Sequence, residues 1–167
     1  NTWSGTIDSY NYTGRTVSVD AFNKYKFSNQ LFVVLGTQFQ YVDMTQKDAY
    51  TDVAREAAKF NLIDPYATVV YNSDFGLNIN AGARLNTHSE YGNQVVYNFN
   101  PSFSFENFPL KVLASYSTAF ITPSLYQLYG PYGNLALTPE ENATAEFGFE
   151  SQLLDKKLTI NAVGFYR

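Results

Sequence analysis

Apolar and polar residues alternate with a period of two along much of the chain, most clearly between residues 76 and 88. Leu77, Ile79, Ala81, Ala83 and Leu85 alternate there with Asn78, Asn80, Gly82, Arg84 and Asn86. Successive side chains of a β-strand point to opposite faces, so one face of this strand is apolar and the other is polar. Its length matches the roughly 9 to 11 residues with which a tilted strand crosses a membrane. Residues 94–106 repeat the pattern, although Pro101 removes a backbone donor.

The same pattern predicts an all-β chain of about nine strands. They span residues 2–9, 15–27, 30–44, 66–73, 76–88, 94–106, 109–120, 142–154 and 157–167. Tight turns are expected at 28–29, 73–75, 107–109 and 154–156, and longer loops at 9–14, 45–65, 88–94 and 121–141. Every second connection is short, which is typical of an antiparallel transmembrane β-barrel with short periplasmic turns and long extracellular loops.

The loop at 45–65 contains the one segment with helical character. Thr51 or Asp52 is placed to cap a short helix that runs to Phe60, with Val53 and Ala57 on the same side. We therefore predict a small helical cap on this surface loop.

Composition favours a membrane barrel over a soluble sheet. Aromatic residues make up 17% of the chain, and tyrosines recur near predicted strand ends at Tyr41, Tyr66, Tyr71, Tyr91 and Tyr97. Aromatic girdles mark both membrane interfaces of outer-membrane barrels, and the Asn-, Ser-, Thr- and Gly-rich polar face suits a wet lumen. A secreted β-sandwich also alternates, so it is the alternative from a different class. The longest apolar run, residues 31–35, is too short for a transmembrane helix.

Closure of the sheet predicts that the chain is part of a larger barrel. Backbone groups at an open edge have no water to bond with inside a bilayer, so a membrane sheet must close. Bacterial single-chain barrels use an even number of strands. Nine strands between Asn1 and Arg167 do not meet these conditions, so we expect further strands to pair with the first and the last.

Residues 115–150 carry a family resemblance. They read SYSTAFITPSLYQLYGPYGNLALTPEENATAEFGFE and combine a strand end at 117–120, Pro-Ser-Leu at 123–125, Gly-Asn at 133–134, Leu-x-Pro-Glu at 137–140 and Glu-x-Gly-x-Glu at 146–150. The composite resembles the barrel region of TonB-dependent outer-membrane receptors. The YQLY core at 126–129 and GARLNTHSEYG at 82–92 are similar to the cobalamin-receptor branch.

The resemblance implies a wall segment of a barrel of ~22 strands in the outer membrane of a Gram-negative bacterium. It implies a receptor and not an enzyme: cobalamin or a related corrinoid would be imported actively, with the TonB complex acting on a plug domain that this chain lacks. A siderophore or other metal-chelate receptor is the alternative within transport. Outer-membrane lipid is an expected partner, a surface lipoprotein is a further one, and the family's cobalamin receptors use calcium at extracellular loops.

Two sets of candidate site residues follow from the pattern and the resemblance. Tyr126, Tyr129, Tyr132 and Asn134 in the loop at 121–141 offer flat amphipathic surface and an amide to a large heterocyclic ligand. Packing of the loop against itself would explain the same aromatics. Arg84, Glu146 and Glu150 occupy the polar face and are candidates for contact with the plug, the alternative being solvation in the lumen.

Other chemistry is weakly supported. The only histidine, His88, precedes Ser89 and Glu90, but neighbours on a strand point to opposite faces and do not make a catalytic triad. An outer-membrane lipase or protease is the enzymatic alternative. The acids at 43, 48, 52 and 64 have no calcium-loop spacing, and we interpret them as a solvated acidic loop. There is no cysteine, and the net charge of -4 with scattered Lys and Arg argues against a nucleic-acid partner.

Overall fold

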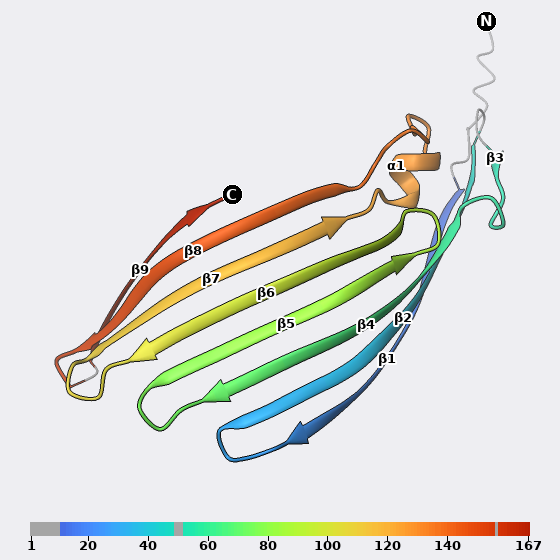
Figure 1. The fold of residues 1–167 in the computed structure, drawn as a ribbon. Coiled ribbons are helices and arrows are strands. Elements are labelled where there is room, and N and C mark those ends of the chain that lie inside the picture. The colour runs from blue at the N-terminus through green and yellow to red at the C-terminus, as the bar shows by residue number, and fades with distance from the viewer. Residues whose placement is uncertain (1–10, 49–51, 156) are drawn as a thin grey trace, which may run out of the picture.

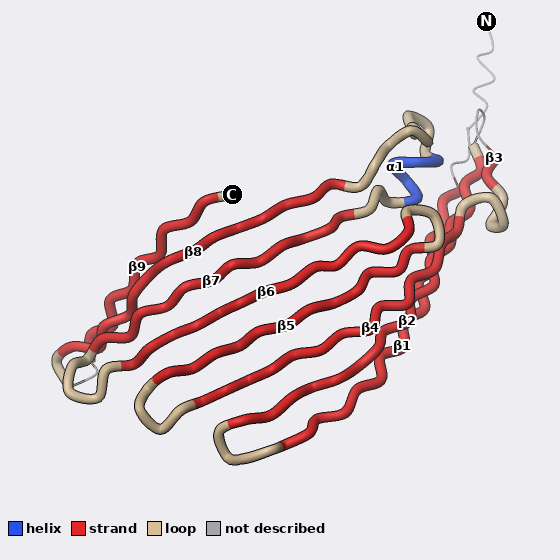
Figure 2. Tube along the Cα trace, viewed as in Figure 1, coloured by secondary structure: helices blue, strands red, loops and turns tan. Residues whose placement is uncertain are grey.

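A computed structural model describes residues 11–48, 52–155 and 157–167, which form one antiparallel β-sheet (Figures 1 and 2). The strands are β1 (Asn11–Lys26), β2 (Leu31–Lys47), β3 (Asp52–Val53), β4 (Lys59–Asn72), β5 (Leu77–His88), β6 (Gly92–Ser104), β7 (Leu110–Ile121), β8 (Glu140–Leu153) and β9 (Leu158–Tyr166). A short helix, α1 (Leu125–Tyr129), lies between β7 and β8. Within the described ranges, no helix is long and apolar enough to cross a membrane.

The sheet is a meander in the order β1-β2-β4-β5-β6-β7-β8-β9, with β3 paired to the far end of β2. Figure 1 shows the sheet curving strongly, with α1 and β3 together at one end and short turns at the other. The two longest connections of the described chain, β2 to β4 and β7 to β8, lie at the end with α1. Long loops are extracellular in outer-membrane barrels, so we call this the outer end. The predicted all-β antiparallel fold is confirmed.

Strand registers keep all the apolar faces on one side of the sheet. Ala67, Ala83 and Tyr97 pair in one row across β4, β5 and β6. The next row along the strands points to the opposite side and consists of Thr68, Gly82, Asn98, Ser117 and Thr144. We call the apolar side the outward face and the polar side the inward face. This confirms the period-two interpretation.

The apolar band on the outward face has the height of a membrane. On β2, the outward-facing residues from Leu31 to Tyr41 are apolar apart from Thr37. Ten residue steps at about 3.3 Å each give about 33 Å along the strand. A tilt of about 40° reduces this to about 25 Å across the bilayer, the height of the apolar band in outer-membrane barrels.

Boundaries at the outer end differ from the sequence prediction. β2 continues to Lys47 and β4 begins at Lys59, so the expected loop at 45–65 is mostly a projecting hairpin. The predicted helix from Thr51 to Phe60 is wrong in its described part, because Asp52 and Val53 form β3 and a turn follows. The cause is that strands of this hairpin extend beyond the membrane, where alternation stops and polar residues resemble a loop.

The bounds of two other predicted loops are also wrong. Residues 11–14 of the expected loop at 9–14 belong to β1. The expected loop at 88–94 is reduced to residues 89–91, because β5 runs to His88 and β6 starts at Gly92, whose φ of 75° suits glycine. Connections therefore do not alternate strictly in length. The predicted strand at 2–9 lies outside the described residues.

Pro101 interrupts a ladder, as its sequence position suggested. Pairing of β6 with β7 passes from Phe99–Tyr116 directly to Ser102–Leu113, although the register is unchanged. Proline has no N–H to donate. Ser115 Oγ donates to Asn100 Oδ1 at 2.8 Å in the gap, so a side-chain bond holds the two strands together there.

A small apolar core forms only at the outer end of the described chain. Met44, Ala58 and Leu125 are buried, with Val42, Val53, Phe60 and Tyr129 packed against them. Elsewhere large apolar side chains such as Phe147 and Phe149 stay exposed on the outward face. A wall that exposes its apolar face in this way requires lipid on that side.

Candidate functional site

The connection between β7 and β8 folds over the inward face at the outer end. Ser124 caps α1: its Oγ accepts from the Gln127 N–H, and Gln127 Oε1 accepts from the Ser124 N–H at 2.8 Å. This reciprocal capping box stabilises a helix too short to persist alone. Leu125 is 6% exposed and packs against Met44 and Ala58. The helix thereby ties the end of β7 to the end of β2 across the mouth.

Tyr126 is the predicted ligand-binding residue that borders a cavity. Its ring meets the ring of Tyr12 edge-on, with centroids 5.5 Å apart. The two rings, Gln46 and Pro131 border a cavity of about 270 Å³, which we call the mouth cavity. Gln46 is buried, and its Nε2 donates to Asp48 Oδ2 at 2.9 Å. Its Oε1 is buried and has no hydrogen-bond partner among the described residues.

The other three predicted ligand residues have different surroundings. Tyr129 is partly buried against the Met44 cluster, which fits the alternative interpretation of loop packing. Tyr132 is 99% exposed at the tip of the loop. Asn134 Oδ1 accepts from the Ala136 N–H at 2.9 Å, so this side chain shapes the loop.

His88 is buried beneath the same region. Its ring stacks between Phe60 and Tyr91, with centroids 4.6 and 5.0 Å away. Nδ1 accepts from the N–H groups of Glu90 and Tyr91, while Nε2 has no partner in the described part of the chain. Burial lowers the pKa of His88 below its ordinary value of 6.5, and the charges of Glu90 and Asp64 oppose this only in part. The ring is a neutral packing element and is not aligned with a nucleophile.

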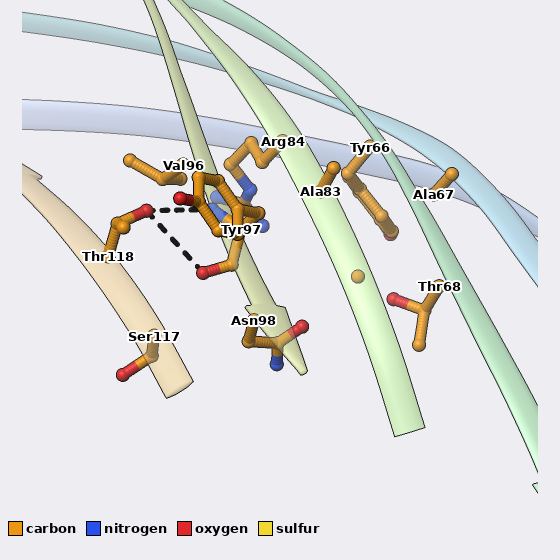
Figure 3. A pocket seen from close by; sticks show the side chains of 11 residues that line it. Tyr66, Ala67, Thr68, Ala83, Arg84, Val96, Tyr97, Asn98, Ser117 and Thr118 are labelled. Carbon is orange, nitrogen blue, oxygen red and sulfur yellow. Dashed lines mark hydrogen bonds between the residues drawn. The ribbon is translucent and has the colours of Figure 1, made fainter. Parts of the chain in front are cut away.

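Arg84 lies on the inward wall, as predicted. Its Nη1 donates to Gln38 Oε1 at 3.1 Å and lies 3.8 Å from Asp64 Oδ2, and the guanidinium stands 5.2 Å from the centre of the Tyr66 ring. Arg84 and Tyr66 line a shallow hollow of about 320 Å³, and their side chains are drawn in Figure 3. Gly82 also lines it, and an added Cβ there would come 2.8 Å from Asn98 Oδ1. Arg84 thus presents a positive charge from a fixed position.

Asp64, which precedes Pro65 in the chain, also joins β4 to β5. Pairing of β4 with β5 stops after Tyr66–Arg84 and resumes only at Leu62–His88. Asp64 Oδ1 fills the gap by accepting from the Thr87 N–H at 3.2 Å. The carboxylate is therefore part of the wall, and it also orients Arg84.

Glu146 and Glu150 share the inward face with Arg84 but do not join it. Gly82 and Thr144 lie in one row across the sheet. Arg84 lies one inward-facing position from Gly82 toward the outer end, whereas Glu146 lies one inward-facing position from Thr144 toward the turn end. Glu150 is at the turn end, opposite Lys111 and in a hollow of about 550 Å³ beside Phe108. The three residues are therefore spread along the wall and do not form one cluster.

The interpretation of a solvated acidic loop is wrong for Asp43 and Asp64. Asp43 has no exposed side-chain area and binds Arg15 and Arg55, and Asp64 is 7% exposed. Asp52 faces Lys47 at 3.8 Å and is exposed. In the residues that the structure describes, no three His, Asp or Glu side chains meet as a metal site. Calcium at the loops stays a prediction.

The sequence reasoning missed Tyr12, Gln38 and Gln46. Tyr12 and Gln46 fell in segments expected to be loops, and both line the mouth cavity with Tyr126 because α1 crosses the mouth. Gln38 sits in a regular inward-facing position of β2, so its period-two place was readable, but its partner Arg84 is 46 residues away. Sequence spacing carries no signal for such contacts.

Comparison with known proteins gives one family. A family model described as "TonB dependent receptor-like, beta-barrel" matches residues 1–167. The vitamin B12 transporter BtuB of Vibrio cholerae serotype O1 is 41% identical over 73 residues, which cover 42% of this chain and 12% of that protein. The chain thus spans a small part of the curated relatives that it matches.

Solved structures share the fold. The ferric enterobactin receptor PfeA of Pseudomonas aeruginosa aligns with a TM-score of 0.79 at 16% identity, covering 92% of this chain and 27% of that one. The siderophore receptor PirA of the same organism aligns at 0.76 and 18%, covering 96% and 32%. The copper transporter OprC aligns at 0.74 and 14%, covering 93% and 29%. At these identities the likeness concerns the fold alone.

Proposed function

Because the chain belongs to the TonB-dependent receptor-like β-barrel family, an outer-membrane family, we propose that it is part of a receptor for active uptake of cobalamin or a related corrinoid. The partial match to a vitamin B12 transporter supports this substrate class. Its role is then transport and not catalysis, and the tyrosines and amides of the mouth bind the ligand.

The mouth cavity is the observation that carries the proposal. A corrinoid is a flat macrocycle bordered by carboxamide groups, so it needs both aromatic faces and hydrogen-bond acceptors. Tyr126 is 52% exposed and supplies a rigid ring held by Tyr12. Gln46 Oε1 supplies a buried acceptor without a partner. A buried polar atom left unpaired costs about 1–3 kcal/mol, which a carboxamide N–H of the ligand would remove.

Tyr132 provides a second aromatic surface for the ligand. It is fully accessible at the tip of the loop and is free to close over a bound macrocycle. Tyr129 and Asn134 act indirectly, since they hold the loop in place.

Energy coupling is the second part of the proposed function. In this family import depends on TonB acting on a plug in the lumen, and Arg84 is the inward-facing group best placed to bind it. Gln38, Asp64 and Tyr66 fix its guanidinium, and several of its N–H donors remain for carbonyl or carboxylate groups. Glu146 and Glu150 extend the contact with the plug toward the turn end. A surface lipoprotein would bind at the outer end.

Binding of cyanocobalamin to the full-length receptor in detergent tests the proposal. Y126A and Q46L should each raise the dissociation constant about ten-fold, equivalent to about 1.4 kcal/mol. Y25A is a matched control, since Tyr25 is similarly exposed but lies near the turn end of β1. It should leave the affinity within about two-fold.

A siderophore or another metal chelate is the second candidate ligand, favoured by the same exposed phenol rings at Tyr126 and Tyr132. Binding of a ferric siderophore with no response to cyanocobalamin would refute the corrinoid and keep the mouth cavity. Binding of cyanocobalamin that neither Y126A nor Q46L weakens would refute the cavity.

A further inference from the structure

An ion cluster lies on the outward face, away from the mouth cavity. Asp43 Oδ2 accepts from Nε and Nη2 of Arg15 at 2.9 and 2.5 Å, and its Oδ1 accepts from Arg55 Nη1 at 2.6 Å. The carboxylate is fully buried, whereas the side chains of Arg15 and Arg55 are 53% and 35% exposed. One buried anion therefore fixes two cations that still reach the surface.

Strand register places this cluster on the lipid side. Arg15, Asp43 and Lys59 pair in one row across β1, β2 and β4. The row one step closer to the membrane contains Val17 and Tyr41, which belong to the apolar band. Met44, the neighbour of Asp43, points inward to the mouth core. The cluster thus faces away from the lumen and from any ligand bound there.

The height of Asp43 matches a lipid headgroup. Asp43 lies two residues beyond Tyr41, which is about 7 Å along the strand and about 5 Å in height. Headgroups add about 5–7 Å to each side of the hydrocarbon core. The carboxylate that holds Arg15 and Arg55 is therefore level with the headgroup layer at the outer end.

The charge of the cluster is unbalanced. Arg15, Arg55 and Lys59 oppose Asp43, and no acceptor contacts the Lys59 ammonium among the described residues. Glu56, next to Arg55 in the turn, is exposed and makes no ion pair in the described chain. Each guanidinium has five N–H donors, of which Asp43 uses two from Arg15 and one from Arg55.

We propose that Arg15, Arg55 and Lys59 form a clamp for the phosphate groups of a lipid headgroup in the outer leaflet. Guanidinium forks match phosphate oxygens in shape and charge. Asp43 aligns the two forks before the lipid arrives, which reduces the entropy lost on binding. The clamp anchors the β2–β4 hairpin, which projects beyond the membrane and otherwise rests only on its small core.

Native mass spectrometry of the full-length receptor tests this with bisphosphorylated lipid A and the same lipid without phosphates. Wild-type receptor should retain the phosphorylated lipid preferentially. The pair R55Q and K59Q should weaken its retention about 30-fold, from about five-fold for each charge lost near a membrane surface. The pair K47Q and K157Q removes two exposed lysines outside the row and should change it less than about two-fold.

Further variants separate the clamp from other effects. The charge-conserving pair R55K and K59R should restore most of the binding. K59Q alone removes no ion pair or side-chain hydrogen bond among the described residues, so it should fold normally, as judged by heat-modifiable migration in gels, and weaken binding about five-fold. Equal retention of the lipid without phosphates, or equal loss in the K47Q and K157Q pair, would overturn the proposal.

Discussion

Replacing Asp43 by Asn should loosen the projecting β2–β4 hairpin without unfolding the barrel. The substitution keeps the shape of the side chain but removes the anion that binds both Arg15 and Arg55. The asparagine oxygen can still accept both hydrogen bonds from Arg15, but the NH2 group then faces the guanidinium donor of Arg55. Three bonds to a carboxylate thus become two weaker bonds to an amide oxygen and one donor–donor conflict.

The size of the effect follows from burial. Breaking a buried ion pair costs about 3–5 kcal/mol when the remaining charge stays buried without a partner. Here the remaining charges are on arginines that are 53% and 35% exposed, and water screens them. We therefore expect about 2 kcal/mol, which corresponds to about a 30-fold increase in the opening of the hairpin.

Hydrogen exchange measured by mass spectrometry on the full-length receptor reports this opening. The Met44 N–H donates to the Ala58 carbonyl at 2.9 Å and closes the hairpin, so its exchange rate follows the opening equilibrium. D43N should accelerate exchange of the peptide covering 42–58 about 30-fold. D52N is the control, because Asp52 and Lys47 are both largely exposed, and it should give less than about three-fold. Unchanged exchange in D43N, or an equal change in D52N, would refute the reasoning.

Two further predictions concern His88 and Gly36. Burial lowers the pKa of His88, so an opened outer end takes up its proton at higher pH than the closed one, and stability should be intact above about pH 6.5 and fall below it. Thermal unfolding between about pH 7.5 and 5.5 should show this fall in wild type and a weaker one in H88F, and parallel curves would exclude His88 as the cause. A Cβ at Gly36 would come 2.4 Å from Cζ of Tyr66, so G36A should displace that ring and cost about 1–3 kcal/mol. Loss of melting temperature checks this, with G14A as the open-space control, and equal losses would contradict it.

Most of the wall could be predicted from sequence because a membrane imposes a regular pattern. Between the two interfaces each outward position must be apolar, so the strands from β5 to β9 were placed within about two residues of the bounds the structure has. The constraint ends at the interface. Residues 45–47 and 59–65 are strand without alternation, and they were therefore expected to be loop.

The candidate site was predictable only in part, for a related reason. Tyr126 and Tyr132 could be named as candidates because they lie in a tyrosine-rich loop at the outer end, and binding residues are common on loops. The helix α1 was not predicted, because its five residues lie between Pro123 and the Gly130-Pro131 pair, which indicate a loop. The Ser124–Gln127 capping box is nevertheless visible in the sequence. The partners of Tyr126 could not be found, since the fold brings Tyr12 to it from over a hundred residues away.

Asp43 and Met44 lie on opposite faces of β2 and make different contacts at the outer end. Side chains alternate between faces, so the strand that carries the buried anion outward carries the core residue inward at the next position. Anchoring of the hairpin in the headgroup layer and packing of α1 over the mouth therefore act on the same short stretch of backbone. Met44 packs against Leu125 at the start of α1, so both contacts rest on two consecutive residues of one strand.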